Sequence, residues 1–268
     1  MAVSVNANEQ LNGTLELSVD KATGETVFVL NGVEETNLTT DAEFGNGDVK
    51  YFTDEDTVSY SALGVQGDWL TLDGNRIFGA KAQSDDAIAV LTIENVADTG
   101  ALVLERLSDT AVPEFGNAEM SGDYFGYWQT GDAGGHLPSQ LVLNPIIGDA
   151  KLTVDFANSM VSGAITNRSL RNLKTNAPGS QLTDVILEDT SIDGFGGFSG
   201  TATGGRHTSS GFDDATVTGS FVGLLTRSQA TGAIGAVEII TNDPEGQEVD
   251  GVALPRDRVE TGIFSVSE

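Results

Sequence analysis

Two glycine–aromatic stretches decide the fold of this chain: NAEMSGDYFGYW (Asn117–Trp128) and ATVTGSFVGLL (Ala215–Leu225). In each stretch a glycine is followed within two residues by an aromatic residue and then by a second glycine. Glycine relieves crowding where a sheet curves strongly, and an aromatic side chain fills the space beside it. The pattern predicts a small, tightly curved antiparallel β-barrel, with Gly126 and Gly219 at corners where a larger residue would clash or would need an unfavourable φ.

Strand signals continue on both sides of these stretches, and no segment has a sustained helical period. A hairpin is predicted with strands at 152–156 and 161–165, and further strands at 231–240 and 261–266. One or two helical turns are possible near Asp41 and Ser228. In the first part of the chain the predicted strands lie at 14–19, 26–30, 48–52, 57–60, 69–72, 76–78, 87–93 and 101–107. The fold class is therefore all-β, with a boundary near Pro113 that separates residues 1–112 from residues 113–268.

Three stretches between the strands are predicted as loops. Residues 168–180 read as a polar loop, residues 193–200 as a glycine-rich corner and residues 243–255 as an acidic loop. The polar loop carries three of the 13 basic residues of the chain, Arg168, Arg171 and Lys174.

The composition excludes several classes of function. The chain has 268 residues, with 13 Lys and Arg against 40 Asp and Glu, which gives a formal charge of −27. Such a charge repels nucleic-acid phosphates and anionic membrane surfaces. With no Cys, thiolate catalysis and Cys-ligated metals are excluded. No apolar run of about 18 residues predicts a membrane span, and the first ten residues show no export signal, so a removed leader, another export route and a cytoplasmic location stay open.

Candidate site residues are few. His136 and His207 lie in loop contexts and are candidate haem ligands, although an exposed loop histidine is the simpler interpretation. The acidic loop offers oxygen ligands for Ca²⁺ but lacks the spacing of known calcium loops, so a solvated surface is the simpler interpretation here too. Its four candidate ligands are Asp243, Glu245, Glu248 and Asp250. No Gly-x-Ser-x-Gly elbow is present, so no catalytic residue is assigned, no enzymatic activity is expected and no cofactor is required.

Several motifs resemble one known family. They are SGDYFG (121–126) preceded by Val112 and Pro113, LTVDF (152–156) with VSGAITN (161–167), VTGSFVG (217–223) and TGAIG (231–235). In this order they resemble the barrel domain of the transferrin-binding protein B family, which comprises surface lipoproteins and soluble haemophore-like relatives of Gram-negative bacteria. The resemblance implies an eight-stranded antiparallel barrel in residues 113–268, preceded by a handle-like β domain in residues 1–112. It also implies an exported or cell-surface, non-enzymatic binding protein.

Two functional classes follow from this reading. The first is a binding protein outside the cell or on its surface, with a protein or small-molecule ligand that the sequence does not identify. The second is a structural subunit of a bacterial surface layer or extracellular filament, because a free N-terminal strand can pair with a neighbouring copy and so build an assembly.

Overall fold

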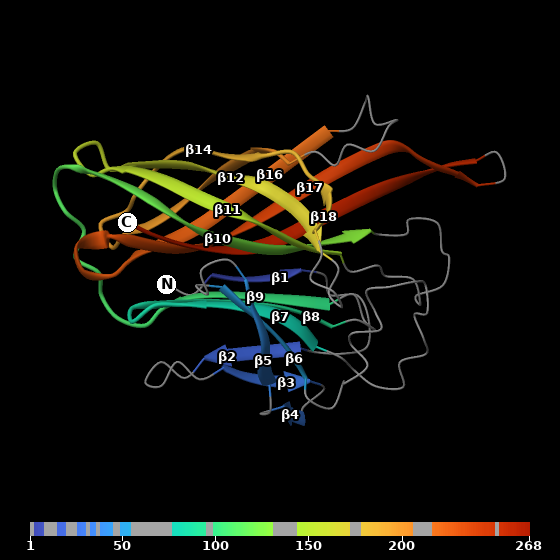
Figure 1. The fold of residues 1–268 in the computed structure, drawn as a ribbon, viewed down its shortest axis with the longest axis horizontal. Coiled ribbons are helices and arrows are strands. Elements are labelled where there is room, and N and C mark those ends of the chain that lie inside the picture. Colours follow the sequence, from blue (N-terminus) through green and yellow to red (C-terminus); the bar gives the residue numbers. More distant parts are fainter. Residues whose placement is uncertain are drawn as a thin grey trace.

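The computed structural model describes residues 3–7, 15–19, 26–30, 33–35, 38–44, 49–54, 77–94, 99–130, 144–171, 178–205, 216–249 and 252–268. Within these ranges the chain is all-β, and its only helical element is the short 3₁₀ helix η3, Ser228–Ala230. The expected fold class is thereby confirmed (Figure 1). The predicted strands at 57–60 and 69–72 lie outside the described residues.

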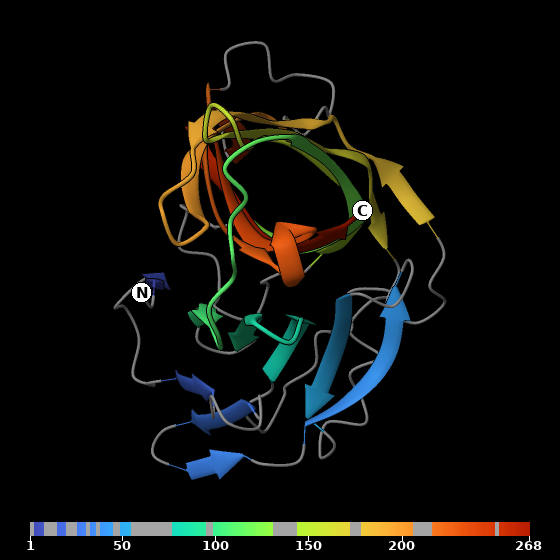
Figure 2. The ribbon, with the colours of Figure 1, turned by 90° about the vertical axis from the view of Figure 1, so that its left-hand side faces the viewer.

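Eight strands of the second part of the chain close into an antiparallel barrel. Each strand pairs with two others, and the pairing of β11 with β12 closes the ring, while the short β13 lies against β12 outside it. Figure 2 shows the barrel from one end. The eight barrel strands are β10 Asn117–Thr130, β11 Asn144–Asp155, β12 Met160–Arg171, β14 Val185–Ser191, β15 Gly197–Gly204, β16 Thr216–Thr226, β17 Gly232–Val249 and β18 Val252–Ser267, and the additional strand is β13 Pro178–Gln181.

Two smaller sheets precede the barrel. A six-stranded antiparallel sheet has the order β1-β9-β8-β7-β6-β5, and a three-stranded sheet has the order β2-β3-β4. Their strands are β1 Val3–Ala7, β2 Leu15–Val19, β3 Thr26–Leu30, β4 Val33–Glu35, β5 Leu38–Phe44, β6 Val49–Asp54, β7 Ile77–Gln83, β8 Ala87–Glu94 and β9 Thr99–Arg106. The helical turn considered near Asp41 is therefore wrong, because Asp41 lies in β5. The predicted division at residue 112 falls in the segment between β9 and β10 and stays a prediction.

Aromatic side chains cover glycines inside the barrel, either on a neighbouring strand or two residues away on the same strand. Phe264 is the register partner of Gly235, and a Cβ built on Gly235 would collide with the Phe264 ring. Tyr124 covers Gly126 and Gly262 in the same way, since a Cβ on Gly126 would lie 2.5 Å from the Tyr124 hydroxyl oxygen. The absent glycine side chains leave the space that the rings fill, so the strands can curve tightly around a packed interior.

A larger residue would clash at both predicted positions, Gly126 and Gly219, although the neighbour that crowds Gly219 is not an aromatic ring. Gly126 is crowded by Tyr124, as expected. Phe221 covers Gly200 rather than Gly219, and a Cβ on Gly219 would instead lie 2.8 Å from the carbonyl oxygen of Ala202. Neither Gly126 nor Gly219 has a positive φ, so close packing within the sheet and not a turn conformation explains both.

The six-stranded sheet packs against the outer face of the barrel. A hydrophobic cluster joins small residues of the sheet with outward-facing apolar residues of β10, β17 and β18. Phe125 and Tyr127 of β10 are buried there and meet edge to face, with ring centroids 6.1 Å apart. The small alanine side chains of the sheet let the two layers approach closely. The sheet residues in the cluster are Ala80, Ala82, Ala87, Ala89, Leu91 and Leu104. The outer face of these barrel strands is thus a second core rather than a free surface.

Two of the three predicted loops are strands over the residues that the structure describes. Arg168 and Arg171 belong to β12, and Arg168 is fully buried, so the prediction of a polar loop beginning at Arg168 is wrong. The described residues of the expected acidic loop at 243–255 belong to the end of a long hairpin, in which β17 extends to Val249 and β18 starts at Val252 (Figure 1). The glycine-rich corner is confirmed as the turn between β14 and β15.

Candidate functional site

A polar cluster lies inside the barrel, where the sequence predicted none. The Tyr124 hydroxyl donates a hydrogen bond of 2.7 Å to Glu260 Oε1, and Arg168 forms a salt bridge with Glu260 Oε2. Arg168 also donates to the backbone carbonyl oxygen of Thr183. All three side chains are at most 1% exposed. Burial, together with the negative charge of Glu260, raises the pKa of Tyr124 well above its ordinary value of 10.0.

A β-bulge turns Arg168 into this interior. Residues 167 and 168 of β12 together face Gly148 of β11, and Asn167 has a φ of 52°. The extra residue reverses the alternation after the inward-facing Ile165, so Arg168 points inward as well. Its side chain crosses Gly148, because a Cβ on this glycine would lie 3.1 Å from Arg168 Cγ. The cluster therefore fills the barrel and ties β10, β12 and β18 together.

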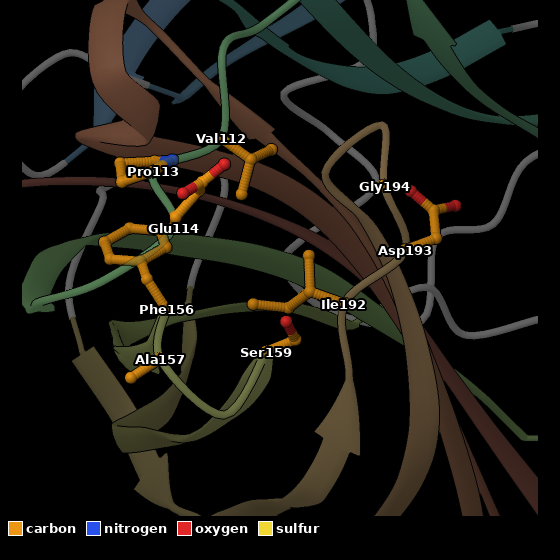
Figure 3. A pocket seen from close by; sticks show the side chains of 9 residues that line it. All are labelled: Val112, Pro113, Glu114, Phe156, Ala157, Ser159, Ile192, Asp193 and Gly194. Carbon is orange, nitrogen blue, oxygen red and sulfur yellow. The ribbon is translucent and has the colours of Figure 1, made fainter.

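An open pocket lies at one end of the barrel, which we call the turn end because the short β11–β12, β14–β15 and β16–β17 connections lie there. The pocket has a volume of about 320 Å³, and three chain segments surround it (Figure 3). One segment leads into β10, and the other two are the β11–β12 and β14–β15 turns. The lining residues are Val112, Pro113, Glu114, Phe156, Ala157, Ser159, Ile192, Asp193 and Gly194.

Backbone hydrogen bonds join the segments around the pocket. Phe156 donates its N–H to the carbonyl of Gly116 at 3.0 Å, and Ile192 donates to Ser159 at 2.8 Å. Leu225 donates to Gly196 at 2.8 Å, which links the β14–β15 turn to β16. The segments are therefore held by the same kind of bonds that hold the sheet, and the pocket is formed in the free protein.

Asp193 and Asp155 fix the two turns that flank the pocket. Asp193 Oδ1 accepts the backbone N–H groups of Phe195 and Gly197, both at 2.8 Å. Asp155 accepts the backbone and side-chain N–H groups of Asn158 at 3.1 and 2.7 Å. These hydrogen bonds from Asn158 lower the pKa of Asp155. Both turns thus carry a negative charge that their own backbone stabilises.

A polar network fixes the segment that leads to Val112. Thr110 donates to Asp86 Oδ2 at 2.6 Å, while Arg106 donates to Thr110 at 2.7 Å and to the Leu225 carbonyl at 3.2 Å. Burial raises the pKa of Asp86, but hydrogen bonds from the Arg227 backbone and from the Thr110 and Ser84 hydroxyls outweigh it, so the net pKa is lowered. The network ties the β7–β8 turn of the sheet to the β16–β17 turn of the barrel.

Two phenylalanines beside the pocket are exposed to solvent. Phe115 directly follows Glu114 and is 79% exposed, and Phe195 directly follows Gly194 and is 77% exposed. Among the residues whose side-chain exposure the structure describes, Ile186 is the one other large apolar side chain that is exposed, at 45%. It lies on the outer wall near the start of β14, away from the turn end. Within that set, the two most exposed aromatic side chains therefore belong to residues that directly follow lining residues of the same pocket.

The pocket lining consists mostly of apolar residues together with two acidic residues. Its two titratable residues are Glu114 and Asp193, and both are exposed. Within the described part of the chain, the Glu114 carboxylate has no hydrogen-bond or ion-pair partner. Arg106 lies behind the β14–β15 turn, where its Nη2 is buried, and it does not line the pocket. The pocket thus combines one unengaged carboxylate with aromatic and aliphatic surface.

The described structure does not test the residues proposed from the sequence as haem and calcium ligands. His136, His207 and Asp250 lie outside the described residues. The backbone of Asp243, Glu245 and Glu248 is in β17 and not in a loop, and the calcium assignment stays a prediction. Considering only what the structure describes, no group of three His, Asp or Glu residues is close enough to hold a metal ion.

The turn-end pocket was not expected from the sequence. The glycine-rich corner at 193–200 was recognised, and its Asp-Gly-Phe-Gly order is a usable signal, because a phenylalanine between turn glycines has little chance of burial. Phe115, between Glu114 and Gly116, carries the same signal. What could not be seen is that the two turns meet, since they are some 80 residues apart in the chain.

Solved structures with a similar course of the chain include three transferrin-binding proteins B. An intact Ap-TbpB with N and C lobes aligns over 90% of this chain and 41% of its own, at 14% identity and a TM-score of 0.45. A mutant of the vaccine antigen transferrin-binding protein B from Haemophilus parasuis Hp5 aligns over 99% of this chain and 44% of its own, at 14% identity and a TM-score of 0.44. The isotype 1 transferrin-binding protein B of serogroup B Neisseria meningitidis aligns over 99% of this chain and 42% of its own, at 14% identity and a TM-score of 0.43.

The chain spans about two-fifths of the length of these structures. Its sequence matches no protein-family model and no curated protein. None of the described segments is a helix long and apolar enough to span a membrane.

Proposed function

We propose that the chain is a non-enzymatic binding protein that works outside the cell or on its surface and contacts its ligand through the turn end of the barrel. The observation that carries this proposal is the placement of Phe115 and Phe195, each more than three-quarters exposed, beside one preformed pocket. Contiguous exposed apolar surface on a folded protein is typical of interaction sites. Aromatic residues are also enriched at such interfaces.

The packing of the rest of the barrel supports the turn end as the contact surface. The described interior is filled by side chains and by the Arg168–Glu260–Tyr124 cluster. The outer face of β10, β17 and β18 is covered by the six-stranded sheet. The pocket volume of about 320 Å³ lies at the small end of the range of about 300–1,000 Å³ for ligand sites, which suits a few side chains of a protein partner.

Export and surface location are part of the proposal. Their support is the resemblance of the barrel motifs to a family of surface proteins and the formal charge of −27, which keeps a protein soluble in a saline exterior. Antibody labelling of intact cells of the native host, compared with lysed cells, tests this part. Labelling that requires lysis would contradict a surface location.

Selection of peptides on the whole chain tests the position of the binding surface. Random peptides displayed on phage are selected on the immobilised protein and then measured against variants. We expect most selected peptides to lose binding to the double variant Phe115→Ala/Phe195→Ala and to keep it for Ile186→Ala, which removes an exposed apolar side chain elsewhere. Binding that is unchanged in the double variant would refute the turn end as the contact surface.

A further inference from the structure

We infer that the turn-end pocket takes an arginine-bearing segment of a protein partner. The inference rests on the proposed function, and it adds the chemistry of the partner. It is carried by three features of the turn end: an unengaged carboxylate in the pocket lining, two exposed phenyl rings on residues that directly follow lining residues, and titratable lining groups that are all acidic.

The charge of the pocket selects a cation. Glu114 lines the pocket and has no ion-pair partner among the described residues, so its carboxylate is available to a ligand. Asp193 and Asp155 add negative charge from the flanking turns, although their oxygens are engaged by backbone and Asn158 N–H groups. The formal charge of −27 draws cationic partners to the whole molecule. An anionic ligand would meet repulsion from every titratable group in the lining.

The phenyl rings favour arginine among the cations. A guanidinium stacks on an aromatic face and pairs with a carboxylate through a planar, two-pronged hydrogen-bond geometry. An ammonium group is more strongly hydrated and makes neither contact as well. Phe115 directly follows Glu114, and Phe195 directly follows Gly194 on the β14–β15 turn, so each ring is carried by a residue next to a lining residue.

The apolar lining indicates which residues would flank the arginine in the partner segment. Val112, Pro113 and Ile192 supply aliphatic surface, and Phe156 supplies a buried ring that joins the barrel core. The methylene groups of an arginine side chain can lie along such a surface while the guanidinium stays at the rim. Apolar residues next to the arginine would then contact Phe115 and Phe195. The expected motif is one arginine with large apolar neighbours in an exposed segment of the partner.

Synthetic peptides on the full chain test this inference. The probe is a fluorescent, end-blocked peptide with one central arginine between leucines, and matched peptides carry lysine, citrulline or glutamate instead. Citrulline keeps the shape of arginine without its charge. Binding is measured by fluorescence polarisation at about 0.01 M and about 0.15 M salt, where the Debye length falls from about 30 Å to about 8 Å.

We expect the arginine peptide to bind most tightly, the lysine peptide more weakly and the glutamate peptide not at all. Glu114→Gln should lower the affinity for the arginine peptide about two- to fivefold and leave the affinity for the citrulline peptide unchanged. Phe115→Ala and Phe195→Ala should each weaken the arginine peptide about five- to thirtyfold. The matched controls Asp184→Asn and Ile186→Ala alter exposed residues near the other end of β14 and should change nothing.

The outcomes separate the inference from the proposed function. If citrulline and arginine peptides bind equally, or no arginine peptide binds, the inference is overturned, whereas peptides selected without bias can still depend on Phe115 and Phe195. If the arginine peptide binds but its affinity is unchanged in both phenylalanine variants, it binds elsewhere on the protein and the inference is overturned; the turn-end surface itself is refuted only if the peptides selected without bias also keep their binding to the double variant. Melting curves of each variant confirm that an exposed substitution has left the fold intact.

Discussion

Replacing Glu260 by Gln should destabilise the barrel strongly, because it leaves a buried cation without its counter-ion. Arg168 is fully buried and Glu260 is 1% exposed. An arginine keeps its charge in a protein, so Glu260→Gln removes only the negative partner. Breaking a buried ion pair in this way costs about 3–5 kcal/mol. The Tyr124 hydrogen bond is a smaller part of the loss, since the amide oxygen of Gln can still accept it.

Urea unfolding followed by circular dichroism measures this loss, and calorimetry should show a fall in Tm of roughly 6–20 °C. The matched control is Glu119→Gln on β10, an exposed position where the same chemical change should stay within about 0.5 kcal/mol. The double variant Arg168→Met/Glu260→Leu should recover most of the stability, because apolar replacement of a buried pair is often neutral. A Glu260→Gln chain as stable as the Glu119→Gln chain would refute the buried pair.

Three further predictions concern packing and pH. Gly262→Ala should destabilise by about 1–3 kcal/mol, because its Cβ would collide with the Tyr124 ring, whereas Gly194→Ala, with no atom within 4 Å, should stay within about 0.5 kcal/mol in the same urea assay. The lowered pKa of Asp86 means that its contribution is present above about pH 4 and lost as pH falls through the folded-state value; unfolding midpoints of Asp86→Asn should therefore depend less on pH between about 4 and 2. The raised pKa of Tyr124 means that stability falls as pH rises above about 10, a fall that Tyr124→Phe should reduce in the same measurement.

The barrel could be predicted because its signal is local. A glycine two residues from an aromatic on one strand indicates that a ring will cover a glycine across the sheet, and Phe264 over Gly235 is one such contact. The hairpin around residues 157–159 was likewise set by alternation on both sides of a polar turn. The eight-stranded count came from the family resemblance, and the structure confirms it.

The buried cluster could not be predicted because it depends on pairing between distant residues. Arg168 and Glu260 are 92 residues apart, and they meet only after β10 to β18 have closed the ring. Alternation counted from Ile165 would point Arg168 outward, and only the bulge at Asn167 reverses it. The extended hairpin of β17 and β18 was missed for a related reason, since acidic residues and Pro244 are poor strand formers, yet strand pairing continues on both sides of an irregularity between Asp243 and Gln247.

The interior aromatic side chains of the closed barrel are buried in its packing, so they are not available to contact a ligand. Tyr124, Phe198, Phe221 and Phe264 each cover a glycine inside, and none is free for contact. Phe125 and Tyr127 are covered by the six-stranded sheet.

Among the side chains that the structure describes, the exposed phenylalanines Phe115 and Phe195 lie between strands, where no strand pairing requires a large apolar residue. An exposed aromatic residue at a turn gives the free protein little stability and increases its tendency to aggregate. Polar residues would suit the tips at Phe115 and Phe195 better if the turns served only to connect strands. The fold and the exposed rings together therefore favour recognition at the turn end, by a surface held rigid from beneath by the barrel core.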